Sequence, residues 1–465
     1  MHEFTLSINN ESIGSDSYFP VINPATEEKI ADCPNASLAQ VNAAVDAADS
    51  AFYQWANDEA MRRDCLLKAS KAIAAKREQF ARLLTQEQGK PLANAFDEVD
   101  GVIHRFARMS HVEIPVDVLQ DDEEIKVAVY RRPLGVVAFI VPWNYPLSMA
   151  AKMTTPLLIG NTIVLKPSPY TPLTALLLGK VLQDIFPAGV INVISGSDQS
   201  GAWLTEHPKV RMIGFTGSVS TGLNIAKVAA NDLKRVSLEL GGNDPAIVLQ
   251  DANPKEVAPK IFWGAFSNAG QICTAIKRLY IHKNLFHPMV EELAQLAKSV
   301  NLGNGLEPNV TMGPVNNKMQ FERISELVSD AKASGKILAG GKAKGTKGYF
   351  FKPTLITDLS DDARIVKEEQ FGPALPILVF DDVEDVIMRC NNTMMGLGSS
   401  VWSSNWQHAA EVASRMQSGV AWVNRNFATH PLAPFGGFKH SGIGREGGPW
   451  GLAAYSEIQT MSIAK

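Results

Sequence analysis

Four short segments of the chain combine a polar or reactive side chain with turn-forming residues. Glycine lets a ligand approach the backbone, and turns and loops present side chains to it. Together the segments offer a hydrogen-bond donor, a phosphate-binding turn, a base and a nucleophile. They are Pro142–Pro146 with Asn144, Phe215–Ser218 with its glycine, Glu239–Asn243 with its carboxylate, and Asn268–Thr274 with Cys273.

Cys273 and Glu239 each allow a structural and a chemical interpretation. A cysteine in a large protein is usually a small buried hydrophobe, whereas an activated thiolate is a strong nucleophile. Glu239 stands beside Gly241 and Gly242 at the end of an apolar stretch. It is therefore either an exposed loop carboxylate or a general base at the rim of a site.

Asn144 and the turn at Gly217 are equally open to two interpretations. Asn144 follows a predicted strand, where an asparagine either forms a turn or donates a hydrogen bond to an oxyanion. The Phe215–Ser218 turn lies between an apolar strand and a helix-like stretch, which suits binding of a pyrophosphate. It matches neither G-x-G-x-x-G nor a G-K-[ST] loop, so a plain structural turn is the alternative.

The composition excludes several classes of protein. With 465 residues, 45% hydrophobic and 20% charged, the chain suits two to four globular domains rather than a disordered or fibrous protein. Lys and Arg number 44 against 48 Asp and Glu, for a net charge of −4. This balance gives no support to nucleic acid as a partner. Four cysteines without a CxxC pair predict neither a disulfide framework nor a metal site.

The start of the chain predicts a cytoplasmic protein. Residues 1–12 lack a basic segment followed by an apolar core, so no signal peptide is expected. No apolar run reaches the roughly 18 residues needed to cross a bilayer, so no membrane association is expected either.

Two runs of alternating strands and helices predict two α/β domains. Short apolar, β-branched strands separated by helix-like stretches are typical of a parallel, doubly wound sheet. The first run has strands at 135–141, 161–165, 190–194 and 212–215, with helices at 147–158, 173–185 and 222–230; the second has strands at 246–249, 278–281, 335–338 and 375–380.

Other elements are expected outside these runs. Ser37 and Gln40 form an S-x-x-Q capping box that begins a helix. A second helical stretch covers about 60–87 and stops at Gly89 and Pro91. Residues 121–132 begin acidic and then alternate in polarity, which predicts a β-hairpin arm.

The motifs PWNYP, LKPS, FTGS, LELGG, GQIC, EEQFGP and PFGGFKHSGIGRE occur in this order. With them the chain resembles the NAD(P)-dependent aldehyde dehydrogenase superfamily, from Ile22–Thr26 to the last twenty residues. The resemblance implies an α/β fold with a Rossmann-like cofactor domain, a second α/β catalytic domain and a small β bridging or oligomerisation arm. The expected boundaries are 1–115 and 133–240 for the cofactor domain, 241–440 for the catalytic domain, and 116–132 with 441–465 for the arm.

The resemblance also implies catalytic roles. Cys273 matches the family's nucleophile, and Asn144 matches the oxyanion donor, with the backbone N–H of Cys273 as the second donor. Glu239 matches the base that activates water to hydrolyse a thioester, and activation of the thiol is its alternative role. Because a CoA-acylating relative does not need this base, Glu239 favours the hydrolytic branch.

Cofactor contacts follow from the same resemblance, with NAD or NADP as the cofactor. Many NAD-preferring members have a glutamate three residues after the motif lysine, where this chain has Pro169. Its absence removes a charge that would repel a 2′-phosphate, and Ser168 could donate to that phosphate. The implied contacts are Lys166 to the adenosine ribose, Glu369 to the nicotinamide ribose, Thr216 and Phe371 near the nicotinamide, Gly217 for clearance, Ser218 near the pyrophosphate, and Trp143 as a further cofactor contact.

The substrate is expected to be a small aldehyde, with Tyr145, Phe427 and Arg425 as tunnel residues. An arginine in succinate-semialdehyde dehydrogenases grips the substrate carboxylate at the position of Lys152. A second arginine of those enzymes corresponds to Ser267 here, so only half of that clamp is present. A semialdehyde substrate is the alternative, and a solvated or cofactor-side role for Lys152 competes with it.

Two further expectations concern activity and assembly. A non-enzymatic relative typically loses the cysteine or the base, whereas Asn144, Glu239, Cys273 and Glu369 are all present here, so an enzyme is expected. In this family the arm and the chain's tail pair with another subunit, which implies a homodimer or homotetramer.

Overall fold

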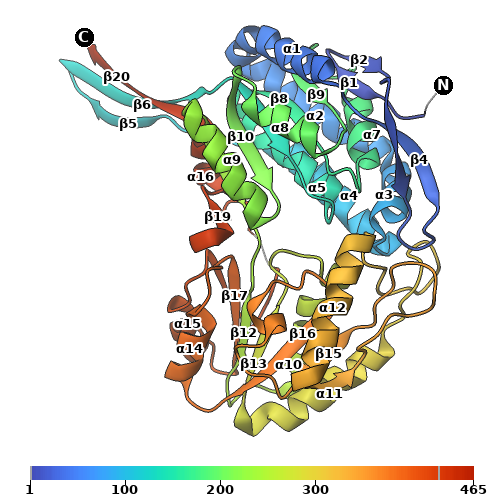
Figure 1. The fold of residues 1–465 in the computed structure, drawn as a ribbon. Coiled ribbons are helices and arrows are strands. Elements are labelled where there is room, and N and C mark those ends of the chain that lie inside the picture. Colours follow the sequence, from blue (N-terminus) through green and yellow to red (C-terminus); the bar gives the residue numbers. More distant parts are fainter. Residues whose placement is uncertain (1–2, 428–429) are drawn as a thin grey trace.

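The computed structural model describes residues 3–427 and 430–465, which form two α/β bodies, one above the other, and a projecting arm (Figure 1). The upper body is built on an eight-stranded sheet in the order β19-β11-β10-β7-β8-β9-β1-β2. Its strands are β1 (Leu6–Ile8), β2 (Glu11–Ile13), β7 (Val136–Ile140), β8 (Thr162–Lys166), β9 (Ile191–Val193), β10 (Val210–Thr216), β11 (Arg235–Glu239) and β19 (Gly442–Ile443).

The five central strands of this sheet, from β11 to β9, are parallel. Alternate residues of β7 enter different cores, with Val137 and Phe139 on one face and Val136 and Ala138 on the other. This confirms the predicted doubly wound sheet, in which strands are buried on both faces. Helices α2 (Glu59–Ala75), α3 (Arg77–Gln88), α4 (Leu92–Met109), α5 (Pro146–Ala150), α6 (Thr154–Ile159) and α7 (Leu173–Leu182) pack on the first face, and α1 (Leu38–Asn57), α8 (Asp198–Glu206) and α9 (Val219–Asn231) on the second.

The lower body repeats this arrangement around a seven-stranded sheet in the order β14-β15-β16-β13-β12-β17-β18. All pairs except β14 with β15 are parallel. The strands are β12 (Pro245–Val248), β13 (Arg278–His282), β14 (Lys336–Ala339), β15 (Thr354–Thr357), β16 (Ala374–Phe380), β17 (Gly398–Trp402) and β18 (Val420–Val423). Helices α10 (Pro254–Phe266) and α11 (Phe286–Ser299) cover one face, and α12 (Lys318–Ser334), α13 (Arg364–Lys367), α14 (Val383–Asn391) and α15 (Trp406–Ser414) the other.

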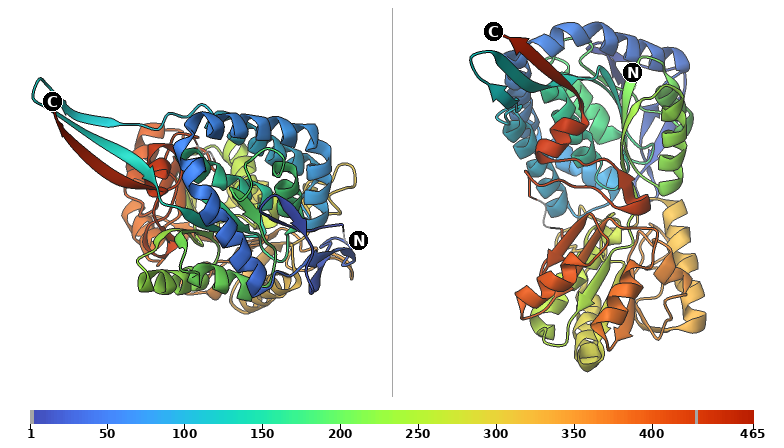
Figure 2. Two further views of the ribbon diagram at one scale, coloured as in Figure 1. Left: turned by 90° about the horizontal axis from the view of Figure 1, so that it is seen from above. Right: turned by 90° about the vertical axis from the view of Figure 1, so that its left-hand side faces the viewer.

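The arm is a three-stranded antiparallel sheet that extends away from both bodies, with the C-terminus near its tip (Figure 2). It confirms the predicted hairpin, with β5 (Asp117–Asp121) and β6 (Ile125–Pro133), and adds β20 (Ser456–Ala464), which pairs with β6 along its whole length. The predicted arm segment 441–465 is nevertheless divided. Its first part, β19, pairs with β11 in the upper sheet, and α16 (Gly448–Ala454) leads to β20.

Local predictions near the N-terminus are confirmed with one change. The Ser37 hydroxyl accepts from the Gln40 N–H and the Gln40 side chain accepts from Ser37 N, so the capping box is complete. The predicted helix at 60–87 is two helices, because Lys76 leaves the helical conformation with ψ 19 between α2 and α3. Strands β3 (Tyr18–Ile22) and β4 (Lys29–Pro34) form a separate two-stranded antiparallel sheet.

Among the described residues, no helix is both long enough and apolar enough to cross a membrane. Nor do three or more His, Cys, Asp or Glu side chains gather into a metal-binding group anywhere in 3–427 or 430–465.

Candidate active site

A cavity of about 2200 Å³ lies where the upper body meets the lower one. The segments that follow β7, β10 and β11 line it, as expected for a ligand site at the carboxyl ends of parallel strands. Lys166, Ser168 and Arg425 are the three predicted site residues outside this lining. The predicted residues in the lining are Trp143, Asn144, Tyr145, Lys152, Thr216, Gly217, Ser218, Glu239, Cys273, Glu369, Phe371 and Phe427, together with Ser267.

Cys273 follows a tight turn that the backbone can make only with a special sequence. Asn268 and Ala269 have φ values of 51° and 55°, and Gly270 has a φ of 72°. A Cβ on Gly270 would lie 2.3 Å from the carbonyl oxygen of Gly372, so this position requires glycine. The turn brings Cys273 to the cavity, and it is the one cysteine of the four that is not fully buried.

The Cys273 thiol needs help to ionise. Burial raises the pKa of the Cys273 thiol to about 12, and the charge of Glu239 adds to this rise. The ammonium groups of Lys277 and Lys152 oppose it. A thiol with so high a pKa is protonated at neutral pH, so its reaction requires a base or a further positive charge.

Asn144 is fixed against the loop that carries Cys273. Its Nδ2 donates to the carbonyl oxygen of Gln271 at 2.8 Å, and its own carbonyl accepts from Nδ2 of Asn268 at 3.0 Å. These two contacts hold the Asn144 amide beside the backbone of the nucleophile loop. Asn144 Nδ2 has a second hydrogen with no acceptor among the described residues, and its role as an oxyanion donor stays a prediction.

A buried ion pair that sequence reasoning missed clamps the segment around Asn144. Lys90 and Glu98 have side-chain exposures of 1% and 0% and contact each other directly. Lys90 Nζ donates to the Asn144 carbonyl at 3.3 Å and lies 3.7 Å above the Tyr145 ring, while Glu98 accepts from the N–H of Ser148 at 2.9 Å. A buried ion pair is costly unless hydrogen bonds complete it, and here its contacts hold the turn in place. Tyr145 is thus packed under Lys90 at the cavity wall.

Glu239 lies at the end of β11 with an exposure of only 5%. Its Oε2 contacts Lys152 Nζ at 2.8 Å, and its Oε1 has no hydrogen-bond partner among the described residues. Burial, followed by the charge of Glu446, raises the pKa of Glu239 to about 7, and Lys152 opposes the rise. A carboxylate with a free oxygen and a near-neutral pKa is suited to accept a proton, so the loop-carboxylate interpretation of Glu239 is wrong.

Lys152 contacts two carboxylates of the protein, whereas the sequence predicted a contact with the substrate. Its Nζ lies 2.8 Å from Glu239 Oε2 and 2.8 Å from Glu446 Oε2. An ammonium group already shared by two carboxylates is not available to grip the carboxylate of a substrate. Ser267, at the other position of the clamp, offers no charge. Glu446 was not predicted, although it is the last residue of the PFGGFKHSGIGRE motif.

The predicted cofactor residues line one side of the cavity, apart from Lys166 and Ser168. Trp143 and Phe371 meet edge to face with ring centroids 5.4 Å apart. Glu369 Oε1 accepts from the Gly242 N–H at 3.2 Å, and a Cβ on Gly241 would come within 2.3 Å of Glu369 Oε2. The close approach of Glu369 to Gly241 explains why the LELGG motif has a glycine at this position after Glu239.

The remaining contacts suit a dinucleotide. Ser218 is the N-cap of α9, and its hydroxyl accepts a hydrogen bond from the Thr221 N–H at 3.3 Å. The N-terminus of this helix borders the cavity, where its N–H groups suit a phosphate. Gly217 packs against the Phe215 ring, with no room for a Cβ. Lys166, at the end of β8, is 3% exposed, and burial lowers its pKa to about 8. Its Nζ has one hydrogen-bond acceptor among the described residues, the Pro167 carbonyl at 3.4 Å, so it keeps capacity for a ligand.

A doubly wound sheet with a thiol and a buried carboxylate in one cavity is typical of a nucleotide-dependent enzyme. Residues 11–461 match the model of the aldehyde dehydrogenase family, and the chain belongs to this family. It therefore oxidises aldehydes with NAD or NADP.

Known proteins resemble the chain along nearly its whole length. It is 38% identical over 457 residues to retinaldehyde dehydrogenase 3 of Rattus norvegicus, covering 96% of this chain and 89% of the relative. It is 39% identical to a probable aldehyde dehydrogenase of Pseudomonas sp, covering 99% and 94%. Neither relative is named as a semialdehyde dehydrogenase, and the comparisons give no support to the semialdehyde alternative.

Solved structures agree with this assignment. The NAD⁺ complex of an aldehyde dehydrogenase from Bacillus cereus superimposes with a TM-score of 0.97, 36% identity and coverage of 99% of this chain and 96% of that one. An NADP-dependent enzyme from E. coli gives a TM-score of 0.96, 34% identity and coverage of 100% and 98%.

Proposed function

We propose that this enzyme oxidises its aldehyde by covalent catalysis at Cys273, with Asn144 as oxyanion donor and Glu239 as base. The observation that carries the proposal is that the thiol and the free Oε1 of buried Glu239 border one cavity, beside an Asn144 fixed to the nucleophile loop. Incubating pure protein with a panel of aldehydes and either cofactor, read as absorbance of reduced nicotinamide, tests it. No absorbance change with any aldehyde would favour a non-enzymatic relative.

The reaction then proceeds in two halves. Cys273 Sγ attacks the carbonyl carbon, and the oxygen takes up negative charge near Asn144 Nδ2 and the Cys273 N–H. When bound, NAD or NADP supplies a hydride acceptor, and loss of the hydride leaves a thioester on Cys273. Glu239 Oε1 accepts a proton from water, whose oxygen attacks the thioester carbon. The C–S bond breaks and the acid departs. The sulfur takes the proton held by Glu239, which replaces the proton that the thiol lost to solvent before its attack.

Lys152 and Glu446 support the base in this scheme. The shared ammonium stabilises the ionised form of Glu239, and the second carboxylate limits that stabilisation. The balance holds the pKa of Glu239 between that of an exposed carboxylate and that of an isolated buried one. Lys152 therefore acts on the base rather than on the substrate.

We expect Pro169 to help determine the choice of cofactor. Pro169 is half-buried one residue after Ser168, whose hydroxyl accepts from the Tyr170 N–H. Pro169→Glu should lower the ratio of kcat/KM for NADP to that for NAD about tenfold or more, because a carboxylate there repels the 2′-phosphate. Pro169→Gln controls for the loss of proline. An equal fall in both variants would mean that backbone shape, not charge, causes it.

We propose a homodimer or homotetramer assembled through the arm. All five residues of β5 are exposed, Leu119 at 68%, and Ile458 on β20 is 54% exposed. Both outer strands of the arm are open edges that favour pairing with another chain.

Light scattering should therefore give two or four times 50.5 kDa. Leu119→Lys with Ile458→Lys should shift the protein toward the monomer, because charges on both strands oppose association. Leu233→Lys, at a leucine that is 86% exposed outside the arm, is the control. A stable 50.5 kDa particle for the unmodified chain would contradict the proposal.

We further propose that residues 1–115 and 133–240 bind the dinucleotide, that 241–440 form the catalytic domain, and that 116–132 and 441–465 serve assembly. The division of strands between the two sheets supports it, apart from β19. A cytoplasmic location is proposed from the four free cysteines. That neither nucleic acid nor a membrane is a partner stays a prediction.

A further inference from the structure

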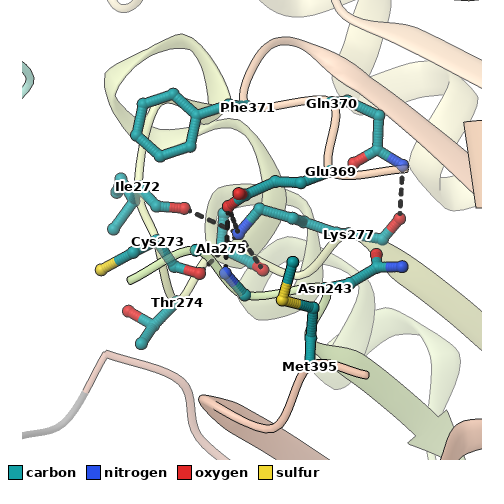
Figure 3. A network of polar contacts seen from close by, with 12 residues as sticks. Asn243, Ile272, Cys273, Thr274, Ala275, Lys277, Glu369, Gln370, Phe371 and Met395 are labelled. Atoms are coloured by element: carbon teal, nitrogen blue, oxygen red, sulfur yellow. Dashed lines mark hydrogen bonds and ion pairs between the residues drawn. The ribbon is translucent and has the colours of Figure 1, made fainter. Parts of the chain in front are cut away.

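A buried lysine lies behind the nucleophile turn, residues 272–275. Lys277 is 2% exposed, and its Nζ donates to the carbonyl oxygens of Ile272 at 2.9 Å, Cys273 at 2.6 Å and Ala275 at 3.5 Å. Figure 3 shows the ammonium inside this turn, with the sulfur of Cys273 pointing away from it. One side chain therefore contacts three of the four carbonyl groups of this turn.

The contact with Ile272 sets the direction of a particular N–H group. The carbonyl of Ile272 and the N–H of Cys273 belong to the same planar peptide, in which the two bonds point in opposite directions. Since the carbonyl points at Lys277, the Cys273 N–H points away from it. This N–H has no acceptor among the described residues, as expected for a donor kept for an oxyanion.

The same ammonium also contacts Glu369. Lys277 Nζ lies 3.4 Å from Glu369 Oε1, the oxygen that accepts from the Gly242 N–H. The Glu369 side chain is 19% exposed toward the cavity, whereas the lysine is enclosed. The backbone of Lys277 is held as well, because Gln370 Nε2 donates to its carbonyl at 3.2 Å (Figure 3). The Lys277 N–H donates to the Asp244 carbonyl at 2.9 Å.

We propose that Lys277 is a positioning residue that couples the Glu369 carboxylate to the nucleophile turn. The proposal rests on the roles proposed above for Cys273 and Glu369. Glu369 neutralises part of the ammonium charge, and the remainder acts on the thiol and on the oxyanion-binding N–H. Lys277 is the largest of the influences that lower the pKa of Cys273. A ligand that engages Glu369 thereby changes the environment of the sulfur.

Two reactions of Cys273 without cofactor separate this role from a structural one. Hydrolysis of p-nitrophenyl acetate by the thiol passes through an oxyanion, whereas alkylation by iodoacetamide does not. Lys277→Met should lower ester hydrolysis at least tenfold. Alkylation measured at the same pH should fall by less than threefold, because it responds to the fraction of thiolate and not to the oxyanion-binding N–H. Lys277→Arg, which keeps the charge, should recover part of the ester rate.

Glu369→Gln tests the coupling from its other end. It leaves the ammonium uncompensated, so ester hydrolysis without cofactor should rise at least threefold at neutral pH. Glu368→Gln is the matched control, because Glu368 pairs with Arg364 and Arg323 instead. Combined with Lys277→Met, the Glu369→Gln effect should vanish.

Three outcomes would overturn the coupling: an unchanged ester rate in Glu369→Gln, an equal rise in Glu368→Gln, or ester hydrolysis and alkylation falling together in Lys277→Met. If Lys277→Met does not fold, the pair of glutamate variants decides alone. The proposed function fails separately, when Cys273→Ala keeps both reactions.

Discussion

Cys273→Ala should abolish aldehyde oxidation while leaving the binding of NAD close to that of the unmodified enzyme. The sulfur forms the only covalent bond between enzyme and substrate in the proposed reaction, so no partial substitute remains when it is lost. Removing a nucleophile typically costs on the order of 10⁴-fold or more in kcat. Reduced nicotinamide reports the activity, and calorimetric titration with NAD reports the binding.

The other three cysteines provide the control for this experiment. Cys33, Cys65 and Cys390 are buried, and burial raises the pKa of each of their thiols, that of Cys65 to about 11. Cys65→Ala should therefore keep the activity apart from any loss of stability. Turnover by Cys273→Ala near the unmodified rate would show that the nucleophile has been misassigned.

Much of the fold was predictable because its strands are buried on both faces and its helices carry local signals. The apolar, β-branched sequences of β7, β8 and β16 predict strands directly. The three-residue β1 is too short to show a pattern, and β17 consists largely of small residues. Neither strand could therefore be predicted from the sequence. Pairing of β20 with β6 joins residues more than 300 positions apart, and only the resemblance to a family indicated it.

The candidate site was predictable where a motif carries a residue proposed to take part in the reaction. Cys273, Glu239 and Asn144 stand in such motifs, and the structure brings them to one cavity. The residues that shift the pKa values of these groups were not predicted. A buried charged residue can be recognised only when the oppositely charged residue beside it in the fold is known. Lys152 and Glu239 are 87 positions apart in the sequence, and nothing local to either indicates the other.

The pH dependence of turnover follows from the environment of Glu239. Burial raises the pKa of Glu239 to about 7, so the carboxylate form needed to accept a proton is present above that pH and is lost as the pH falls through it. Hydrolysis of the thioester should therefore slow below about pH 7. If hydrolysis limits the rate, kcat should fall tenfold for each further pH unit.

Glu239→Gln should separate the two halves of the reaction. The amide keeps the shape of the side chain but cannot accept a proton, and a positioned base contributes typically about 10²–10⁴-fold. Rapid mixing with aldehyde and cofactor should show a burst of reduced nicotinamide near one per active site, followed by very slow turnover. The burst amplitude measures acylation of Cys273, and the slow phase measures hydrolysis. Glu368→Gln, at a half-buried glutamate that pairs with Arg364, should give neither change.

A missing burst would instead assign Glu239 to the thiol. Since the Cys273 thiol has a pKa raised to about 12, a base is needed for the first step unless another charge supplies the shift. If Glu239 is that base, Glu239→Gln slows acylation too, and activity recovers at high pH as the thiol ionises by itself. We expect the burst, because Lys277 and Lys152 already lower the pKa of the thiol and a cationic nicotinamide ring adds a further positive charge. Hydrolysis has no comparable substitute, since the proton of the attacking water needs an acceptor, and Glu239 Oε1 has no hydrogen-bond partner among the described residues.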